Sequence, residues 1–171
     1  MAASDIPAAE VDVTPDLVRR LLATQHPDLA DEPLRVAASG WDNVVLRLGD
    51  RLAVRMPRRA AGAELIEHEQ RWLPELANEL PLPIPAPVRV GLPGSGYPWR
   101  WSVVPWFDGQ VAADTELADP AAAAQQLGEF VAAFHRPAPG DAPRNPARDV
   151  FVGDRSAVFT EAVTRAGPLL D

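Results

Sequence analysis

The stretch LRLGDRLAVRMPRR, residues 46–59, constrains the fold more than any other part of the sequence. Apolar and polar residues alternate on both sides of Gly49 and Asp50, which predicts two antiparallel strands joined by a tight turn. A loop of two residues would mix apolar and charged side chains on each face, whereas a loop of three, residues 49–51, separates them. We therefore favour the three-residue loop, with Val44, Leu46, Leu48, Leu52, Val54 and Met56 on one face and Val45, Arg47, Ala53 and Arg55 on the other.

The same alternation places a permanent charge in a strand that otherwise resembles core. Arg55 stands between Val54 and Met56, and its guanidinium cannot lose its proton. A half-buried cation needs a partner of opposite charge or a ligand. All 16 basic residues of the chain are arginine, so any position where the fold requires a cation is filled by arginine here.

Composition limits the class of protein. Hydrophobic residues make up 47% of the 171 residues, which is enough for a core in one domain or two small lobes. No apolar run reaches the about 18 residues of a membrane span, and the N-terminus has no signal-peptide pattern. The absence of cysteine excludes disulfides and thiolate sites, and the net charge of −8 argues against general nucleic-acid binding. We expect a cytoplasmic protein that binds neither membranes nor nucleic acid.

The remaining patterns predict an ordered series of elements. A helix capped by Thr14 ends before His26, strands cover residues 34–38, 44–48 and 52–56, and a helix covers 61–80. Two strands, 88–92 and 99–104, form a hairpin, and a helix capped by Asp119 and a short helix after residue 156 follow. In the 61–80 helix we expect Pro74 to kink or shorten it and Leu65, Trp72, Leu73 and Leu76 to form the apolar stripe. This order predicts an α+β fold, with a helix inserted after the third strand of a five-stranded antiparallel sheet.

Four stretches in this order resemble the aminoglycoside phosphotransferase family, which has the protein-kinase fold, and in particular its macrolide-phosphotransferase-like branch. They are GWDNVVLRLGDRLAVRMPRR, ELIEHEQRWLPELANELPLPIPAPVRVG, YPWRWSVVPWFDG and QQLGEFVAAFHR. Together they cover about residues 14–136 in one collinear order. The resemblance implies a kinase-like N-terminal lobe, followed by the first helices of a helical C-terminal lobe. It also implies transfer of the γ-phosphate of ATP or GTP to a hydroxyl of an aminoglycoside-like or macrolide-like substrate, and hence antibiotic resistance.

The resemblance implies a role for the strand arginine. In kinase-like folds, a small residue on the third strand lies against the adenine. Two positions later, a cation holds the α- and β-phosphates and pairs with a glutamate on the inserted helix. The matching positions are Ala53 and Arg55, and the helix glutamate is Glu69, with Glu67 and Glu64 as alternatives. An Arg55–Glu69 ion pair would also hold the helix against the sheet.

Further contacts to the nucleotide follow from the same resemblance. Val45 is expected against the adenine. The loop ASGWDNVV lacks the glycine-rich motif of protein kinases, and the backbone N–H groups from Gly40 to Asn43 are expected near phosphate, with an ordinary β-turn as the alternative. At the hinge between the lobes the Val104 carbonyl and the Trp106 N–H are expected to bind the purine, while the Trp106 side chain packs.

The part of the family pattern that performs chemistry is not found. No HGD-like catalytic loop follows residue 107, nor do the asparagine and aspartate that hold Mg²⁺. We therefore expect no catalytic residue and no metal ligand in this chain, with the Mg²⁺ ligands in a missing part of the C-terminal lobe. Residues 1–104 would form the nucleotide-binding lobe, 105–109 the hinge and 110–171 a C-terminal lobe truncated before its catalytic loop.

Two interpretations of function follow. The chain is the nucleotide-binding part of a small-molecule phosphotransferase, or it is a catalytically inactive nucleotide-binding or interaction module. Apolar surface that the helical lobe would cover predicts a fragment, self-association, or completion by another chain.

Overall fold

The computed structural model describes residues 7–143, 156, 160–161 and 164–165. The chain divides into two compact units, Met1–Arg136 and Pro137–Asp171. The sheet, its helices and the candidate site all lie in the first unit. Most of the short helix predicted after residue 156 falls outside the described residues.

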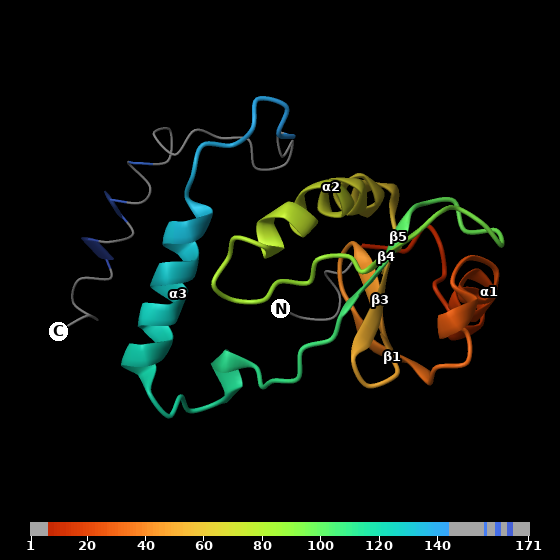
Figure 1. Cartoon of the computed structure of the whole chain (residues 1–171), viewed down its shortest axis with the longest axis horizontal. Helices are drawn as coiled ribbons and strands as arrows, with labels where there is room; N and C mark the ends of the chain where they lie inside the picture. Colours follow the sequence, from red (N-terminus) through yellow and green to blue (C-terminus); the bar gives the residue numbers. More distant parts are fainter. Residues whose placement is uncertain (1–6, 144–155, 157–159, 162–163, 166–171) are drawn as a thin grey trace. The chain divides into compact units, whose positions relative to one another are not determined.

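One antiparallel sheet with the strand order β1-β2-β3-β5-β4 forms the centre of this unit (Figure 1). Its strands are β1 (Leu34–Ser39), β2 (Asn43–Leu48), β3 (Leu52–Pro57), β4 (Arg89–Gly91) and β5 (Trp101–Pro105). Helix α2 (Ala60–Ala77) lies between β3 and β4 in the chain. The predicted α+β arrangement, a five-stranded sheet with a helix inserted after the third strand, is confirmed.

The pairing of β2 with β3 has the predicted three-residue loop. Leu48 lies opposite Leu52, so residues 49–51 form the connection. Gly49 adopts φ +58°, the left-handed region that a residue without a Cβ enters without strain. With this register, Arg55 lies on one face with Val45 and Ala53. The opposite face carries the apolar residues predicted for it, Val44, Leu46, Leu48, Leu52, Val54 and Met56.

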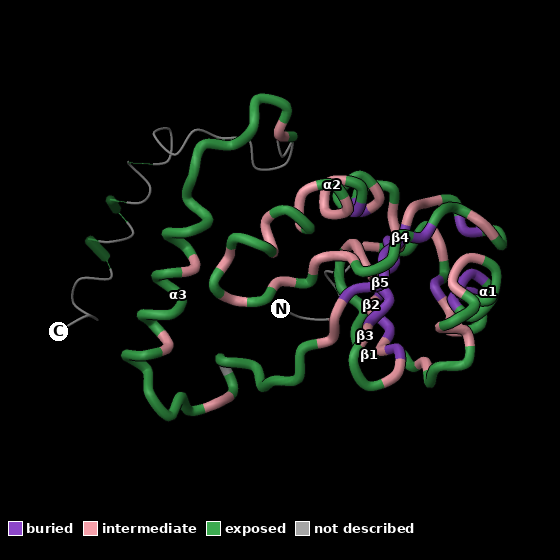
Figure 2. The backbone as a smooth tube through the Cα atoms, in the orientation of Figure 1, coloured by how far each residue is buried: buried purple, intermediate pink, exposed green. Residues whose placement is uncertain are grey.

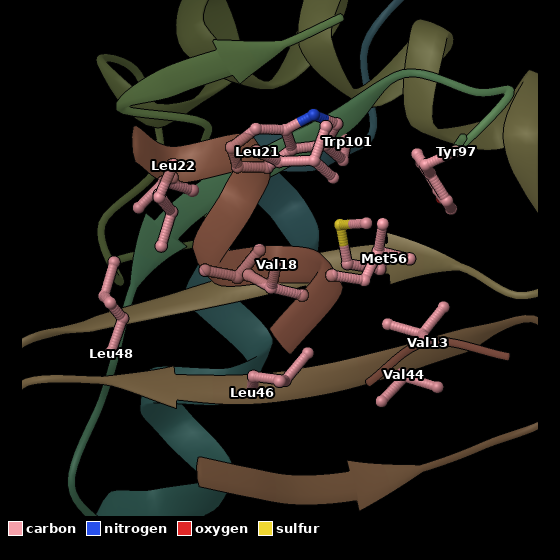
Figure 3. Close-up of a cluster of buried hydrophobic side chains, with 13 residues drawn as sticks. Val13, Val18, Leu21, Leu22, Val44, Leu46, Leu48, Met56, Tyr97 and Trp101 are labelled. Carbon is pink, nitrogen blue, oxygen red and sulfur yellow. The ribbon is translucent and has the colours of Figure 1, made fainter. Parts of the chain in front are cut away.

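The core lies between that apolar face and helix α1 (Pro15–Gln25). The Leu17 N–H donates to the Thr14 hydroxyl at 3.2 Å, which caps the helix as predicted. Buried residues concentrate on the inner side of α1 and on β2, β3 and β5 (Figure 2). The cluster, much of which Figure 3 shows, comprises Val13, Leu17, Val18, Leu21, Leu22, Val44, Leu46, Leu48, Val54, Met56, Tyr97, Trp101 and Val103.

Helix α2 departs from the sequence prediction in two respects. It continues past Pro74 to Ala77 and is not shortened there, although the proline removes one backbone hydrogen bond. Its fully buried apolar side chain is Ile66, whereas Leu65, which the prediction placed in the apolar stripe, is exposed. The reason is that α2 packs through the face that also carries Gly62 and Glu69, so a polar residue shares the side turned to the sheet.

The remaining helices are η2 (Pro27–Leu29), η3 (Ala112–Asp114) and α3 (Pro120–Phe134), the first two being single 3-10 turns. The Ala122 N–H donates to Asp119 at 2.9 Å, so α3 begins with the predicted cap. Helix α3 also carries exposed apolar side chains, since Leu127, Val131 and Phe134 are 60%, 40% and 49% accessible. Within the described part of the chain, no helix has the length and apolar character needed to cross a bilayer.

The pairing of β4 with β5 can be tested through the packing of Trp101 on Gly91. Gly91 lies opposite Trp101, and a Cβ added at Gly91 would overlap the indole ring. We expect Gly91→Ala to lower the free energy of unfolding by about 3 kcal/mol, because the fully buried ring has no room to move. Urea denaturation measures this. Gly109→Ala is the matched control, since no heavy atom of the described chain lies within 4 Å of its added Cβ. Equal unfolding free energies for the two variants would contradict the packing.

Candidate functional site

A cleft of about 530 Å³ opens on the sheet face that carries Arg55. It extends from the β1–β2 loop to the segment after β5. All the residues predicted to bind nucleotide line it except Glu69, which lies behind Arg55 on α2. The lining residues are Ala38, Gly40, Trp41, Asp42, Asn43, Val45, Ala53, Arg55, Pro85, Val104, Pro105, Trp106 and Phe107.

Strand pairing brings the cleft residues together. Val45 lies opposite Ala38 on one side and Arg55 on the other, and Arg55 lies opposite Ser102. In the next row, Ala53 pairs with Val104. Ala53 and Val104 are buried and Val45 is half-buried, so this part of the cleft has apolar walls beside a charged group. Such a combination suits a flat apolar ring attached to an anion.

The strand arginine has the predicted partner. Arg55 Nη2 lies 2.9 Å from Glu69 Oε1, and the two side chains are 28% and 22% exposed. The alternative glutamates are placed elsewhere: Glu67 lies 3.9 Å from Arg100, and Glu64 is exposed. Burial raises the pKa of Glu69 above its ordinary value of 4.5, and the Arg55 guanidinium opposes that rise. The pair therefore aligns the Arg55 guanidinium at the edge of the cleft.

Gln70 adds a second connection between α2 and the sheet, which the sequence did not reveal. Its Nε2 donates to the Trp101 carbonyl at 2.9 Å and to the Ser102 hydroxyl at 3.0 Å. Ser102 is buried and lies directly opposite Arg55. Helix α2 is thus joined to both β3 and β5. No local pattern marks a glutamine for this role, because its partners lie more than 30 residues later in the chain.

The β1–β2 loop differs in part from the prediction. The Gly40 N–H donates to the Asn43 carbonyl at 2.9 Å, so Gly40 closes a turn and its N–H is not available to phosphate. The N–H groups of Trp41 and Asp42 make no hydrogen bond within the described residues. The Asn43 Oδ1 is buried and has no partner among them. The loop is therefore a turn that leaves polar groups for a ligand to satisfy.

The hinge prediction is wrong about its donor. The Trp106 N–H donates to the Arg51 carbonyl at 2.8 Å and so extends the β3–β5 ladder. Because hydrogen-bonded pairs alternate along an antiparallel ladder, the Val104 carbonyl faces β3 too. The Val103 carbonyl accepts from the Val88 N–H on the opposite side, so by the same alternation the Pro105 carbonyl faces away from β3. The Phe107 N–H has no hydrogen-bond partner within residues 7–143.

The Trp106 side chain packs against Arg47, as expected. The Arg47 guanidinium lies 5.0 Å from the centroid of its ring. The indole N–H donates to Asp108 Oδ1 at 3.1 Å, and Arg47 Nη2 lies 3.5 Å from the same oxygen. These contacts fix the segment after β5 against β2.

Comparisons with known proteins bear on the family and the fold of this chain. A family model described as phosphotransferase enzyme family matches residues 33–158. No curated protein sequence matches the chain. Among solved structures, the GDP complex of aminoglycoside 2'-phosphotransferase-IIIa superimposes with a TM-score of 0.65 and 22% identity, over 90% of this chain and 53% of that one.

Two further structures show the same fold. The streptomycin–ATP–APH(2'')-IIa ternary complex has a TM-score of 0.53 and 17% identity, over 94% of this chain and 50% of the other. Macrolide 2'-phosphotransferase type I has a TM-score of 0.52 and 21% identity, over 93% and 56%. The chain thus spans about half the length of the solved structures that it matches.

The raised pKa of Glu69 leads to a pH-dependence of stability. A carboxyl whose pKa is raised by folding contributes stability that is present below its unfolded pKa and lost as pH rises through its folded pKa. We therefore expect the unfolding free energy of the wild type, minus that of Glu69→Gln, to fall as pH rises from below 4.5 toward neutrality. Urea denaturation between about pH 4 and pH 7 measures this difference.

A variant without the guanidinium sharpens this test. In Arg55→Met the opposing charge is gone. The unfolding free energy of Arg55→Met, minus that of Arg55→Met combined with Glu69→Gln, should therefore fall more steeply with pH than the same difference measured with Arg55 present. A difference that rises with pH would show that Arg55, and not burial, dominates the carboxyl.

Proposed function

The chain belongs to the phosphotransferase enzyme family, and from that premise we propose that its cleft binds the nucleoside triphosphate, ATP or GTP, whose γ-phosphate is transferred. The observation that carries the proposal is the Arg55–Glu69 ion pair at the edge of an apolar cleft. A guanidinium held by a carboxylate in this position is suited to the α- and β-phosphates.

The base would occupy the apolar end of the cleft. Ala53, Val45 and Val104 offer surfaces without bulky side chains to a flat ring. The Pro105 carbonyl is an acceptor turned from β3, and two residues later the Phe107 N–H is a donor without a partner in residues 7–143. A purine carries neighbouring donor and acceptor groups on one edge, so it can satisfy both. These two groups replace the Val104 carbonyl and the Trp106 N–H in the proposal.

The phosphates would extend toward Arg55 and the β1–β2 loop. The N–H groups of Trp41 and Asp42 lie in the loop that lines this end of the cleft and make no hydrogen bond within the described residues. Successive backbone N–H groups in a turn are suited to an anion. Asn43 also lines this end of the cleft, and the group of its side chain that would donate to phosphate is Nδ2, because the amide oxygen only accepts.

The acceptor would be a hydroxyl of an aminoglycoside-like or macrolide-like compound, which would make the complete activity one of antibiotic resistance. The matched structures include a streptomycin–ATP complex and a macrolide 2'-phosphotransferase, which support this class of substrate. We propose that residues 1–104 form the nucleotide lobe, 105–109 the hinge and 110–171 the start of a helical lobe. No group of three carboxylates or histidines among the described residues fits a metal ion, so no step is assigned to Mg²⁺ here.

An inactive nucleotide-binding or interaction module is the second candidate. It is favoured by the exposed apolar residues of α3, a surface suited to self-association. Phosphate transfer to kanamycin or erythromycin, followed with labelled ATP and GTP, separates the two candidates. Nucleotide binding without transfer would favour the module.

Arg55 provides the direct test of nucleotide binding. We expect Arg55→Met to raise the dissociation constant for ATP or GTP at least about tenfold, because it removes charge-assisted hydrogen bonds to phosphate. Isothermal titration calorimetry measures it. Arg89→Met is the matched control, since Arg89 pairs with Asp28 at 3.6 Å on β4 and does not line the cleft. Equal affinities for both variants would contradict the role of Arg55.

The hinge donor can be tested by removing its proton. We expect Phe107→Pro to weaken purine nucleotide binding about tenfold relative to Phe107→Ala, because only the proline lacks the N–H. The alanine variant controls for the lost ring, which also lines the cleft. The sheet should be unaffected, since this N–H has no partner in residues 7–143. Equal binding by the two variants would exclude the Phe107 N–H as a contact.

A further inference from the structure

The β1–β2 loop contacts the beginning of α2, and Asp42 makes these contacts. Asp42 Oδ1 lies 3.5 Å from Arg59 Nη1, with side chains that are 36% and 26% exposed. The Asp42 carbonyl accepts from the Arg58 N–H at 2.8 Å. Arg58 and Arg59 directly precede α2, so side chain and backbone of one loop residue both bind the β3–α2 junction.

Gly62 lets the loop approach the helix closely. This residue is buried in the first turn of α2, and a Cβ added there would lie 2.8 Å from the Asp42 carbonyl oxygen and 3.0 Å from the Asp42 Cβ. No side chain larger than hydrogen fits without moving the loop. Loop and helix are therefore in direct contact, and the ion pair is not an isolated surface interaction.

Arg58 holds the other end of the turn. Its Nη1 donates to the Gly40 carbonyl and to the Ser39 hydroxyl, each at 3.2 Å. The Gly40 N–H in turn donates to the Asn43 carbonyl. The loop backbone is thus bonded at Gly40, Asp42 and Asn43, while the N–H groups of Trp41 and Asp42 make no bond within the described residues.

Helix α2 carries the second phosphate-binding element, because Glu69 on this helix orients Arg55. We propose that Asp42 is a positioning residue that joins the loop to α2, so that the loop N–H groups and the Arg55–Glu69 pair meet the phosphates as one preformed unit. This inference rests on the proposed nucleotide site. Its energetic basis is preorganisation, since a loop already held in place loses less conformational entropy when an anion binds.

The expected signature of this role depends on the number of phosphates. Asp42→Asn should raise the dissociation constant for ATP about fivefold and leave that for adenosine within about twofold, because adenosine does not contact the loop. The guanosine series replaces these ligands if GTP is the nucleotide bound. Asp28→Asn is the matched control, since Asp28 is also in an ion pair, 3.6 Å from Arg89, and does not line the cleft. It should affect neither constant.

Two additional measurements keep the test decisive. Hydrogen exchange at the Gly40 amide, without nucleotide, should be faster in Asp42→Asn than in the wild type, because the turn it closes is released. A variant that combines Asp42→Arg with Arg59→Asp should restore both the slow exchange and the ATP affinity. This double variant decides the matter if Asp42→Asn does not fold.

Each other result overturns the inference. Equal weakening for ATP and adenosine would show general loss of structure, and unchanged ATP affinity would show that the attachment does not act on phosphate. Failure of the double variant to restore affinity would exclude the ion pair as the cause. If the wild type binds no nucleotide, the proposed function falls and the phosphate role falls with it, whatever Gly40 exchange reports about the loop.

Discussion

The ion pair between Arg55 and Glu69 connects the sheet, the inserted helix and the cleft. A guanidinium on a half-buried strand face is unfavourable without a partner, and Glu69 supplies it at 2.9 Å. Burial raises the pKa of the Glu69 carboxyl, and the arginine beside it opposes that rise. Each charge therefore requires the other, and α2 must stay close to β3 to keep them together. Gln70 strengthens the same junction through Ser102.

One face of the sheet forms the core and the other lines the cleft, and the register of β2 with β3 decides which residues lie on each face. The three-residue loop at Gly49 turns the larger apolar side chains of the hairpin, such as Leu46 and Met56, toward α1 and leaves Val45, Ala53 and Arg55 on the opposite face. A shift by one residue would expose the core and bury the arginine in it. The core thus supports the cleft without contributing to it, which suits a site that must stay fixed when it is empty.

In the polar parts of the cleft, some backbone groups are hydrogen-bonded within the protein, while neighbouring N–H groups have no partner in the described residues. At the hinge, the Trp106 N–H donates to the Arg51 carbonyl, whereas the Phe107 N–H has no partner within residues 7–143. At the loop, the Gly40 and Asp42 carbonyls are bound by Arg58. The contacts of Arg47 with Trp106 and Asp108 hold the hinge similarly. The side chains of Arg47 and Arg58 make the contacts to Trp106, Asp108 and Gly40 in a chain that contains no lysine.

The sequence by itself determined the elements and the hairpin register, because alternation and capping residues are local properties, whereas the Arg55–Glu69 pair followed from the resemblance to a known family. It was wrong about which apolar side chain of α2 is buried, Ile66 and not Leu65, and about the hinge donor. The tertiary structure alone decided these, as well as the contacts of Gln70 with Ser102 and of Gly62 with Asp42. The direction of an N–H in a ladder, or the approach of a loop to a helix, depends on partners distant in the chain, which local periodicity does not record.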